Sequence, residues 1–169
     1  MLTLIKKYET NLSSYRLIKT KDNRGFVINF DYFDNLNFKS KKSFYCFNHK
    51  KGTVRGMHIQ TKIRQKKILF VLKGKIYDVL INFDKKSKNY LKQYHIELDS
   101  NKNNLLFIGN NFLHGYQTLT SNVELIYFMD NVFSSQNYKK FPFKNDLFKV
   151  NFPNKISNIS SSDKINNLK

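Results

Sequence analysis

Short runs of aromatic and β-branched residues recur along the whole chain, and turn residues separate them at close, regular spacing. Helical periodicity is nearly absent, and the aromatic content of 15 % is almost all Phe and Tyr, which favour strands. Many short strands in this arrangement are typical of an antiparallel sandwich or barrel. We therefore predict an all-β fold with strands at 26–30, 43–47, 68–72, 75–82, 94–98, 105–108, 112–119 and 123–129.

Two local signals add detail to this prediction. Lys73-Gly74 lies between two apolar runs, which is the usual signature of a tight hairpin. Residues 31–36 indicate one short helical turn.

The length of 169 residues is that of one ordinary domain with a sizeable core. No internal repeat or linker divides the chain, and we expect a single domain over residues 1–153. Residues 154–169 are rich in Ser and Asn and poor in aromatics, a composition that predicts a loose tail. Asp163 lies in that tail.

The chain is strongly basic, with 30 Lys and Arg against 12 Asp and Glu and a net charge of +18. Such a surplus can indicate a polyanionic partner, such as nucleic acid, an anionic membrane or a phosphorylated substrate. The lysines are scattered, and no basic helix or Arg-rich stripe appears. A bias in composition explains the charge better, so we expect neither a nucleic-acid partner nor membrane association.

Cysteine content and hydropathy point to the cytoplasm. Cys46 is the only cysteine, so no internal disulfide can form. The apolar runs are too short to span a bilayer. The charges near the N-terminus follow a very short apolar piece, which is the reverse of a secretory signal.

The run Arg55-Gly56-Met57-His58-Ile59-Gln60 carries the clearest chemical signal. An arginine can grip an anion, a glycine lets the backbone pass tightly, and a histidine can move a proton near neutral pH. Lys67 follows seven residues after Gln60 and opens a dense apolar run. The combination suits chemistry on a negatively charged small molecule that carries a carbonyl group.

Further motifs precede and follow this run in a fixed order. With it, they resemble the dTDP-4-dehydrorhamnose 3,5-epimerase family over roughly residues 15–153, with a weaker likeness at Asp163. The motifs are Asp22-Asn23-Arg24-Gly25-Phe26, Asn48-His49, the run at 55–60, residues 67–74 with Tyr77-Asp78-Val79, Asn111-Phe112-Leu113-His114-Gly115-Tyr116, Glu124-Leu125-Ile126-Tyr127 and Phe152-Pro153.

The resemblance implies a cupin-type antiparallel β jelly roll with a few short helical turns. It also implies a cofactor-independent carbohydrate epimerase, an isomerase that acts in deoxysugar biosynthesis for a surface polysaccharide. Its substrate would be a nucleoside-diphosphate 4-keto-6-deoxy sugar, inverted through an enolate either at C3 and C5 or at C3 alone. By analogy with the family we expect a homodimer.

The resemblance assigns four catalytic roles. His58 would be the base, and Asp163 would fix its tautomer and support the imidazolium. Lys67 would stabilise the enolate oxygen. Tyr127 would return a proton from the opposite face of the sugar.

The resemblance also assigns substrate-binding residues. Arg24 and Arg55 would hold the pyrophosphate through bidentate guanidinium contacts. Asn48 would help to hold the nucleotide end, Gln60 belongs to the same binding set, and His114 would position the substrate.

No catalytic metal and no cofactor are expected. Metal-binding cupins usually present two histidines one residue apart, followed by a Glu and a later His. Here Ile59-Gln60 follows His58, and no Cys and His cluster replaces the missing pair.

The chain departs from the family pattern in residues that would shape the substrate pocket. Cys46-Phe47 stands where the family has a Gln, and Phe128-Met129-Asp130-Asn131-Val132-Phe133 replaces a Lys-x-Thr-x-Tyr-Tyr pattern. The nucleotide (dTDP, GDP or CDP), the sugar (hexose or heptose) and the number of inverted centres therefore stay open. The alternatives are an epimerase for C3 alone that acts on a GDP- or CDP-linked sugar, a 3,4-ketoisomerase and a non-catalytic cupin that binds sugar nucleotides.

Overall fold

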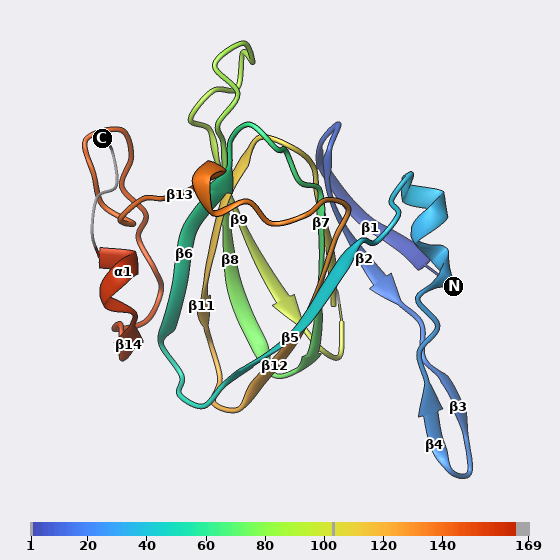
Figure 1. Cartoon of the computed structure of the whole chain (residues 1–169). Coiled ribbons are helices and arrows are strands. Elements are labelled where there is room, and N and C mark those ends of the chain that lie inside the picture. The colour runs from blue at the N-terminus through green and yellow to red at the C-terminus, as the bar shows by residue number, and fades with distance from the viewer. Residues whose placement is uncertain (1, 103, 165–169) are drawn as a thin grey trace.

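The computed structural model describes residues 2–102 and 104–164, and two antiparallel sheets packed face to face make up most of it (Figure 1). The prediction of an all-β antiparallel fold is confirmed. In spatial order, the first sheet contains β1 (Leu2–Glu9), β2 (Leu12–Leu17), β10 (Leu105–Ile108), β7 (Lys67–Lys73), β12 (Val123–Met129) and β5 (Lys42–Asn48). The second contains β13 (Tyr138–Lys140), β6 (Thr53–Gln60), β11 (Phe112–Thr118), β8 (Lys75–Asn82) and β9 (Gln93–Asp99).

The remaining elements are short. β3 (Thr20–Asp22) and β4 (Gly25–Val27) form a separate hairpin, so the strand expected at 26–30 ends at Val27. The 3-10 helix η1 (Asp31–Leu36) confirms the helical turn expected there. A second 3-10 helix, η2 (Ser135–Asn137), precedes β13. Among the described residues, no helix is long and apolar enough to cross a membrane.

Apolar side chains fill the space between the two sheets and also cover their outer faces. Leu69 of β7 and Leu80 of β8 belong to the central cluster. Val79 and Ile81, on the opposite face of β8, pack under the segment that carries Phe141, Phe148 and Val150. A strand buried on both faces is apolar throughout rather than alternating. This explains why β8 is apolar between Lys75 and Asn82 apart from Asp78.

The expected hairpin at Lys73-Gly74 is wrong. β7 pairs with β10 and β12 in the first sheet, whereas β8 pairs with β9 and β11 in the second. Gly74 is therefore a corner at which the chain changes sheets. Its φ of +81° is in the region that favours glycine, and a Cβ there would lie 2.6 Å from Thr120 Oγ1. A local turn signal cannot tell which sheet the next strand will join.

The C-terminal segment is better ordered than its composition predicts. β14 (Asn158–Ile159) pairs in parallel with Thr53 and Val54 of β6, and the helical turn α1 (Ser161–Lys164) follows it. Asp163 is buried. Backbone pairing to an existing strand holds this polar stretch, which needs few apolar side chains of its own. Residues 165–169 of the expected tail lie outside the described residues.

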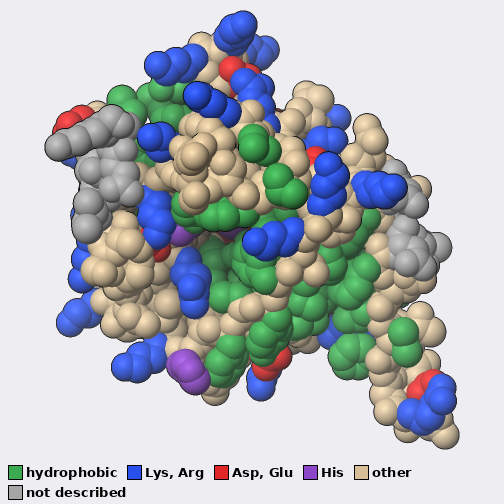
Figure 2. Space-filling model, in the orientation of Figure 1, with side chains coloured by type: hydrophobic (Ala, Val, Ile, Leu, Met, Phe, Trp, Pro, Cys, Tyr) green, Lys and Arg blue, Asp and Glu red, His purple; other side chains and the backbone are tan. Residues whose placement is uncertain are grey.

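Apolar side chains are also exposed at one side of the molecule. The β3–β4 hairpin projects away from the body (Figure 1), and Phe26 and Val27 on it are 56 % and 67 % exposed. The edge strand β5 exposes Phe44, Tyr45 and Phe47. Hydrophobic side chains gather over the face that carries β5 (Figure 2).

Candidate active site

A cavity of about 340 Å³ opens between the two sheets. Figure 2 shows the hollow, with Lys and Arg side chains around its mouth and hydrophobic side chains within it. Strands β5, β6, β7, β11 and β12 supply most of its wall, and β13 and the segment leading into α1 close one side. The lining residues are Lys42, Phe44, Cys46, Arg55, His58, Gln65, Lys67, His114, Tyr116, Tyr127, Met129, Phe133, Tyr138, Lys140, Ser160 and Asp163.

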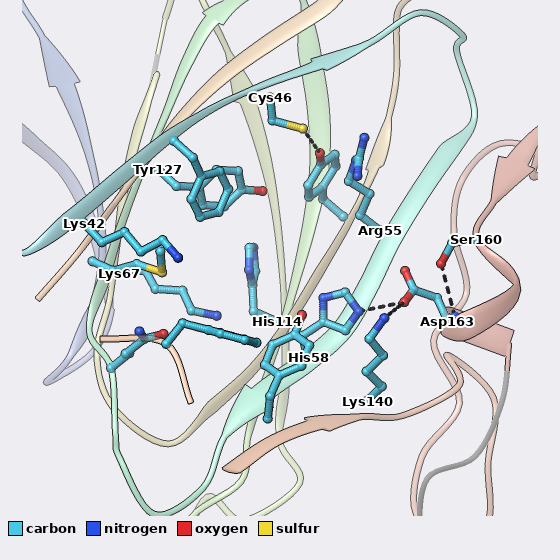
Figure 3. A pocket seen from close by; sticks show the side chains of 16 residues that line it. Lys42, Cys46, Arg55, His58, Lys67, His114, Tyr127, Lys140, Ser160 and Asp163 are labelled. Carbon is cyan, nitrogen blue, oxygen red and sulfur yellow. Dashed lines mark hydrogen bonds and ion pairs between the residues drawn. The ribbon is translucent and has the colours of Figure 1, made fainter. Parts of the chain in front are cut away.

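All four residues that the sequence assigned to catalysis line this one cavity. His58 comes from β6, Lys67 from β7, Tyr127 from β12 and Asp163 from α1. Figure 3 shows the side chains of His58, Lys67 and Tyr127 approaching the hollow from different sides, with Asp163 behind the imidazole. The fold therefore gathers groups that are more than a hundred residues apart in the sequence.

His58 and Asp163 form a buried pair. His58 Nε2 lies 2.9 Å from Asp163 Oδ1, and the Gly56 N–H donates to Asp163 Oδ2 at 3.3 Å. Burial lowers the pKa of His58 below its ordinary value, although Asp163 opposes the shift. Burial alone would raise the pKa of Asp163, but the hydrogen bonds from His58, Gly56 and Lys140 outweigh it and hold that pKa well below the usual range. The pair thus stands as neutral imidazole beside carboxylate at neutral pH.

A close approach of two glycines sets the position of His58. Gly56 has a φ of +128°, and a Cβ on it would lie only 2.4 Å from Gly115 Cα on the neighbouring strand. β6 and β11 pair with a register irregularity at this point, and His58 lies directly opposite His114. Only glycine permits this contact. It brings the two histidines side by side at the cavity wall.

Lys67 lies at the start of β7, near the buried carboxyl group of Asp78. Burial lowers the pKa of Lys67 to about 8, and the nearby Asp78 acts in the opposite direction. Asp78 Oδ1 lies 2.7 Å from His114 Nε2, and both side chains are buried. Burial raises the pKa of Asp78 despite the attraction of His114 and Lys67. Lys67 thus lines the cavity near the buried Asp78–His114 pair.

Tyr127 presents a phenol that stays protonated. Its ring stacks on Phe44 with centroids 4.8 Å apart and an interplanar angle of 25°. Burial raises the pKa of Tyr127 well above its ordinary value, and Tyr116 and Asp78 add to the shift. A neutral, positioned phenol can give a proton to carbon but does not compete as a base.

The residues expected to bind substrate are only partly brought together. Arg55 and His114 line the cavity. Asn48 lies behind Arg55 and accepts from Arg55 Nε at 2.9 Å. Gln60 instead joins backbone segments, donating to Ile63 and Val132 and accepting from the Ser134 N–H. Arg24 lies in the projecting hairpin, outside this cavity, and pairs with Asp22.

Comparison with known proteins fits this geometry. The model of the family described as dTDP-4-dehydrorhamnose 3,5-epimerase matches residues 10–169. The chain belongs to the dTDP-4-dehydrorhamnose 3,5-epimerase family. It is 27 % identical over 151 residues to a dTDP-4-dehydrorhamnose 3,5-epimerase of Shigella flexneri, covering 85 % of this chain and 81 % of that protein.

Solved structures of the dTDP-4-dehydrorhamnose 3,5-epimerase family share the fold. The enzyme from Sulfolobus tokodaii superposes with a TM-score of 0.83 at 27 % identity, covering 96 % of this chain and 92 % of that one. The enzyme from Bacillus anthracis, solved with TDP and PPi bound, superposes with a TM-score of 0.87 at 22 % identity, covering 98 % of each chain. The jelly roll expected from the family resemblance is thereby confirmed.

Sequence reasoning assigned no role to several residues that line this cavity or lie behind it. Asp78 left a signal, because it is the one acidic residue inside the apolar run at 75–82. Lys140 and Tyr138 left none, since nothing sets Lys140 apart among 30 Lys and Arg. Among residues 2–102 and 104–164, no three His, Cys, Asp or Glu side chains group closely enough to hold a metal ion.

Proposed function

We propose that this protein inverts C3 and C5 of a dTDP-linked 4-keto-6-deoxy sugar through an enolate intermediate. The observation that carries the proposal is one cavity that joins a neutral His–Asp pair, a buried ammonium group and a protonated phenol. A C–H next to a ketone is a very weak acid, and its removal needs a base, a positive group at the ketone oxygen and a proton donor for the other face.

His58 takes the proton from carbon in this scheme. Its Nε2–H donates to Asp163 Oδ1, which leaves the lone pair on Nδ1, on the side of the ring turned away from Asp163 (Figure 3). The carboxylate stabilises the imidazolium as it forms. Because burial lowers the pKa of His58, the base form prevails at neutral pH.

Lys67 and Tyr127 complete the cycle. The Lys67 ammonium stabilises the negative charge that develops on the C4 oxygen when the C–H bond breaks. The Tyr127 O–H then protonates the same carbon from the other face, which inverts it. Solvent returns a proton to the Tyr127 phenolate, and His58 releases its own. Each positioned proton-transfer group contributes roughly 10²- to 10⁴-fold to the rate.

Incubation with dTDP-4-keto-6-deoxyglucose in D₂O tests this proposal. Mass spectrometry of the product counts the carbon-bound deuterium that replaces the abstracted protons. Two deuterons per molecule are expected, at C3 and C5. One deuteron, at C3, would make the protein a single-centre epimerase. None, from protein whose fold is verified by circular dichroism, would contradict the proposal, and His58→Asn supplies the matched inactive control.

A thymidine nucleotide fits what the neighbours contain, since the Bacillus anthracis structure holds TDP and PPi. Arg55 offers a guanidinium at the cavity wall, where Asn48 fixes its orientation. Equilibrium binding of TDP, GDP and CDP at equal ionic strength tests the nucleotide assignment. We expect the tightest binding for TDP, and equal binding of all three would refute it.

We also propose a homodimer in which the hairpin of one copy supplies Arg24 to the cavity of the other. The Arg24 side chain is 84 % exposed, and its hairpin carries Phe26 and Val27 far from the core. Exposed apolar groups on β5 and on the hairpin need a cover. Sedimentation at micromolar concentration should give a dimer. Mixing inactive His58→Asn with Arg24→Ala protein should restore activity, because each mixed dimer then contains one intact site; no gain would exclude the exchange.

A further inference from the structure

We propose that Lys140 is a positioning residue that clamps the helical turn α1 against β6 and shares the Asp163 carboxylate with His58. The expected effect on the reaction rate rests on the proposed function, but the expected effect of Lys140 on α1 and on the His58 pKa does not. His58 of β6 and Lys140 of β13 both contact one oxygen, Oδ1 of Asp163 in α1 (Figure 3).

Lys140 reaches this position because β13 pairs with β6. Lys140 and His58 are register partners across the two strands, so their side chains leave the sheet side by side. Lys140 Nζ donates to Ser162 Oγ at 2.7 Å and to Asp163 Oδ1 at 3.2 Å. Its side chain lines the cavity and is 25 % exposed. One ammonium group therefore holds two consecutive residues of α1.

The helical turn needs such an anchor. α1 has four residues, and an isolated helix of that length is unstable in water. Within the turn, the Ser160 hydroxyl and carbonyl accept from the Asp163 N–H at 3.2 and 3.1 Å. That contact holds the turn together but does not attach it to the sheet. Asp163 attaches the turn to β6 through His58 Nε2 and the Gly56 N–H, and the bonds from Lys140 tie it to β13 as well.

The charge of Lys140 also acts on the base. The groups that face His58 are Asp163 from α1, Lys140 and Tyr138 from β13, Lys67 from β7, His114 from β11, Tyr127 from β12 and Arg55 on β6 itself. Burial is the largest cause of the lowered pKa of His58, Asp163 opposes it, and Lys67 and Lys140 both lower the pKa further. Tyr138 and Tyr127 remain neutral because burial raises their pKa.

Sharing the carboxylate has a defined consequence for catalysis. The Lys140 amino group donates to Asp163 Oδ1, and this bond weakens the pull of that oxygen on a proton at His58. His58 then stays unprotonated to lower pH, and the acidic limb of the rate profile moves down with it. Asp163 still orients the ring, because its bond to Nε2–H persists.

Lys140→Gln tests the inference, since it removes the charge and retains a hydrogen-bond donor. Lys139→Gln is the matched control, because Lys139 is adjacent on β13 and does not line the cavity. Lys140→Arg restores the charge. The readouts are the His58 pKa from imidazole NMR titration, made without substrate, and the pH dependence of kcat and KM.

We expect the His58 pKa in Lys140→Gln to rise by about half to one unit. The acidic limb of the kcat profile should move to higher pH by the same amount. The value of kcat should fall about tenfold, and KM should change less than twofold. Lys139→Gln should match the wild type, and Lys140→Arg should recover most of the difference. An unchanged or lowered His58 pKa in folded Lys140→Gln would overturn the inference. If the NMR shift appears in protein that turns over no sugar nucleotide, the proposed function fails while the role of Lys140 stands.

Discussion

Replacing Asp163 by Asn removes the negative charge beside the proposed base, His58, and changes the shape of the site little. In the native protein, a carboxylate oxygen lies 2.9 Å from His58 Nε2. Coulomb's law with an effective dielectric constant of about 20 gives an attraction of about 6 kcal/mol between imidazolium and carboxylate at that distance. Lys140 and the Gly56 N–H also donate to the Asp163 carboxylate, which weakens its attraction for the imidazolium. We therefore assume that the carboxylate lowers the free energy of the transition state by about half of this attraction, about 3 kcal/mol.

That magnitude predicts a fall in kcat of about a hundredfold for Asp163→Asn. The assay is single-turnover conversion of the 4-keto sugar nucleotide, followed by NMR, with KM measured in parallel. Asp146→Asn is the control for loss of one negative charge, because Asp146 is exposed and does not line the cavity. A fall of less than threefold in folded Asp163→Asn would refute the reasoning, since the carboxylate would then play no part in proton transfer.

The same substitution has a stability signature with a definite sign. The pKa of Asp163 is held below its usual value in the folded protein. Such a group adds stability above its unfolded pKa of about 3.9, and that stability is lost as the pH falls through the folded pKa. The Tm difference between wild type and Asp163→Asn should thus be largest above about pH 4 and shrink in stronger acid. A difference that grows on acidification would contradict the ion pair.

Three further outcomes are expected. Because burial lowers the pKa of Lys67 to about 8, kcat should fall as the pH rises through about 8, and Lys67→Arg should move that limb to higher pH; a limb unmoved in Lys67→Arg would remove Lys67 from the alkaline transition. Lys67→Met should raise the Tm at neutral pH while lowering kcat, because the folded state disfavours the charged lysine; a lower Tm would contradict that desolvation. Gly56→Ala should lower the free energy of unfolding, measured with denaturant, by at least about 2 kcal/mol, whereas Gly25→Ala should lower it by about 1 kcal/mol, because Gly25 has a similar φ but open space around it. Equal losses in the two variants would show that the contact of Gly56 with Gly115 is unimportant.

The sequence predicted strands and chemistry better than it predicted connections. Runs such as 68–72 and 75–82 are apolar enough to be strands in any arrangement, so their positions followed directly. The turn between them did not, because Lys73-Gly74 serves a hairpin and a change of sheet equally well. Only the pairing of β7 and β8 with different partners decides between the two.

The candidate site shows the same division. His58 and Lys67 stand in distinctive motifs, and the fold places both at the cavity. Asp163 was expected in a loose tail, because the composition of residues 154–169 does not reveal that β14 pairs with β6. Lys140 was not expected at all, because its role depends on the register between β13 and β6. Contacts created by register and by an added edge strand leave no mark in local sequence.

Tyr127→Phe in D₂O gives the most direct test of the division of labour between base and acid. His58 should still remove and return the proton on its own face, so recovered substrate should gain deuterium at C3 without inversion. His58→Asn should show neither exchange nor inversion. Inverted product from Tyr127→Phe at more than about a tenth of the wild-type rate, or exchange that survives in His58→Asn, would contradict the assignment of these two residues to opposite faces of the sugar.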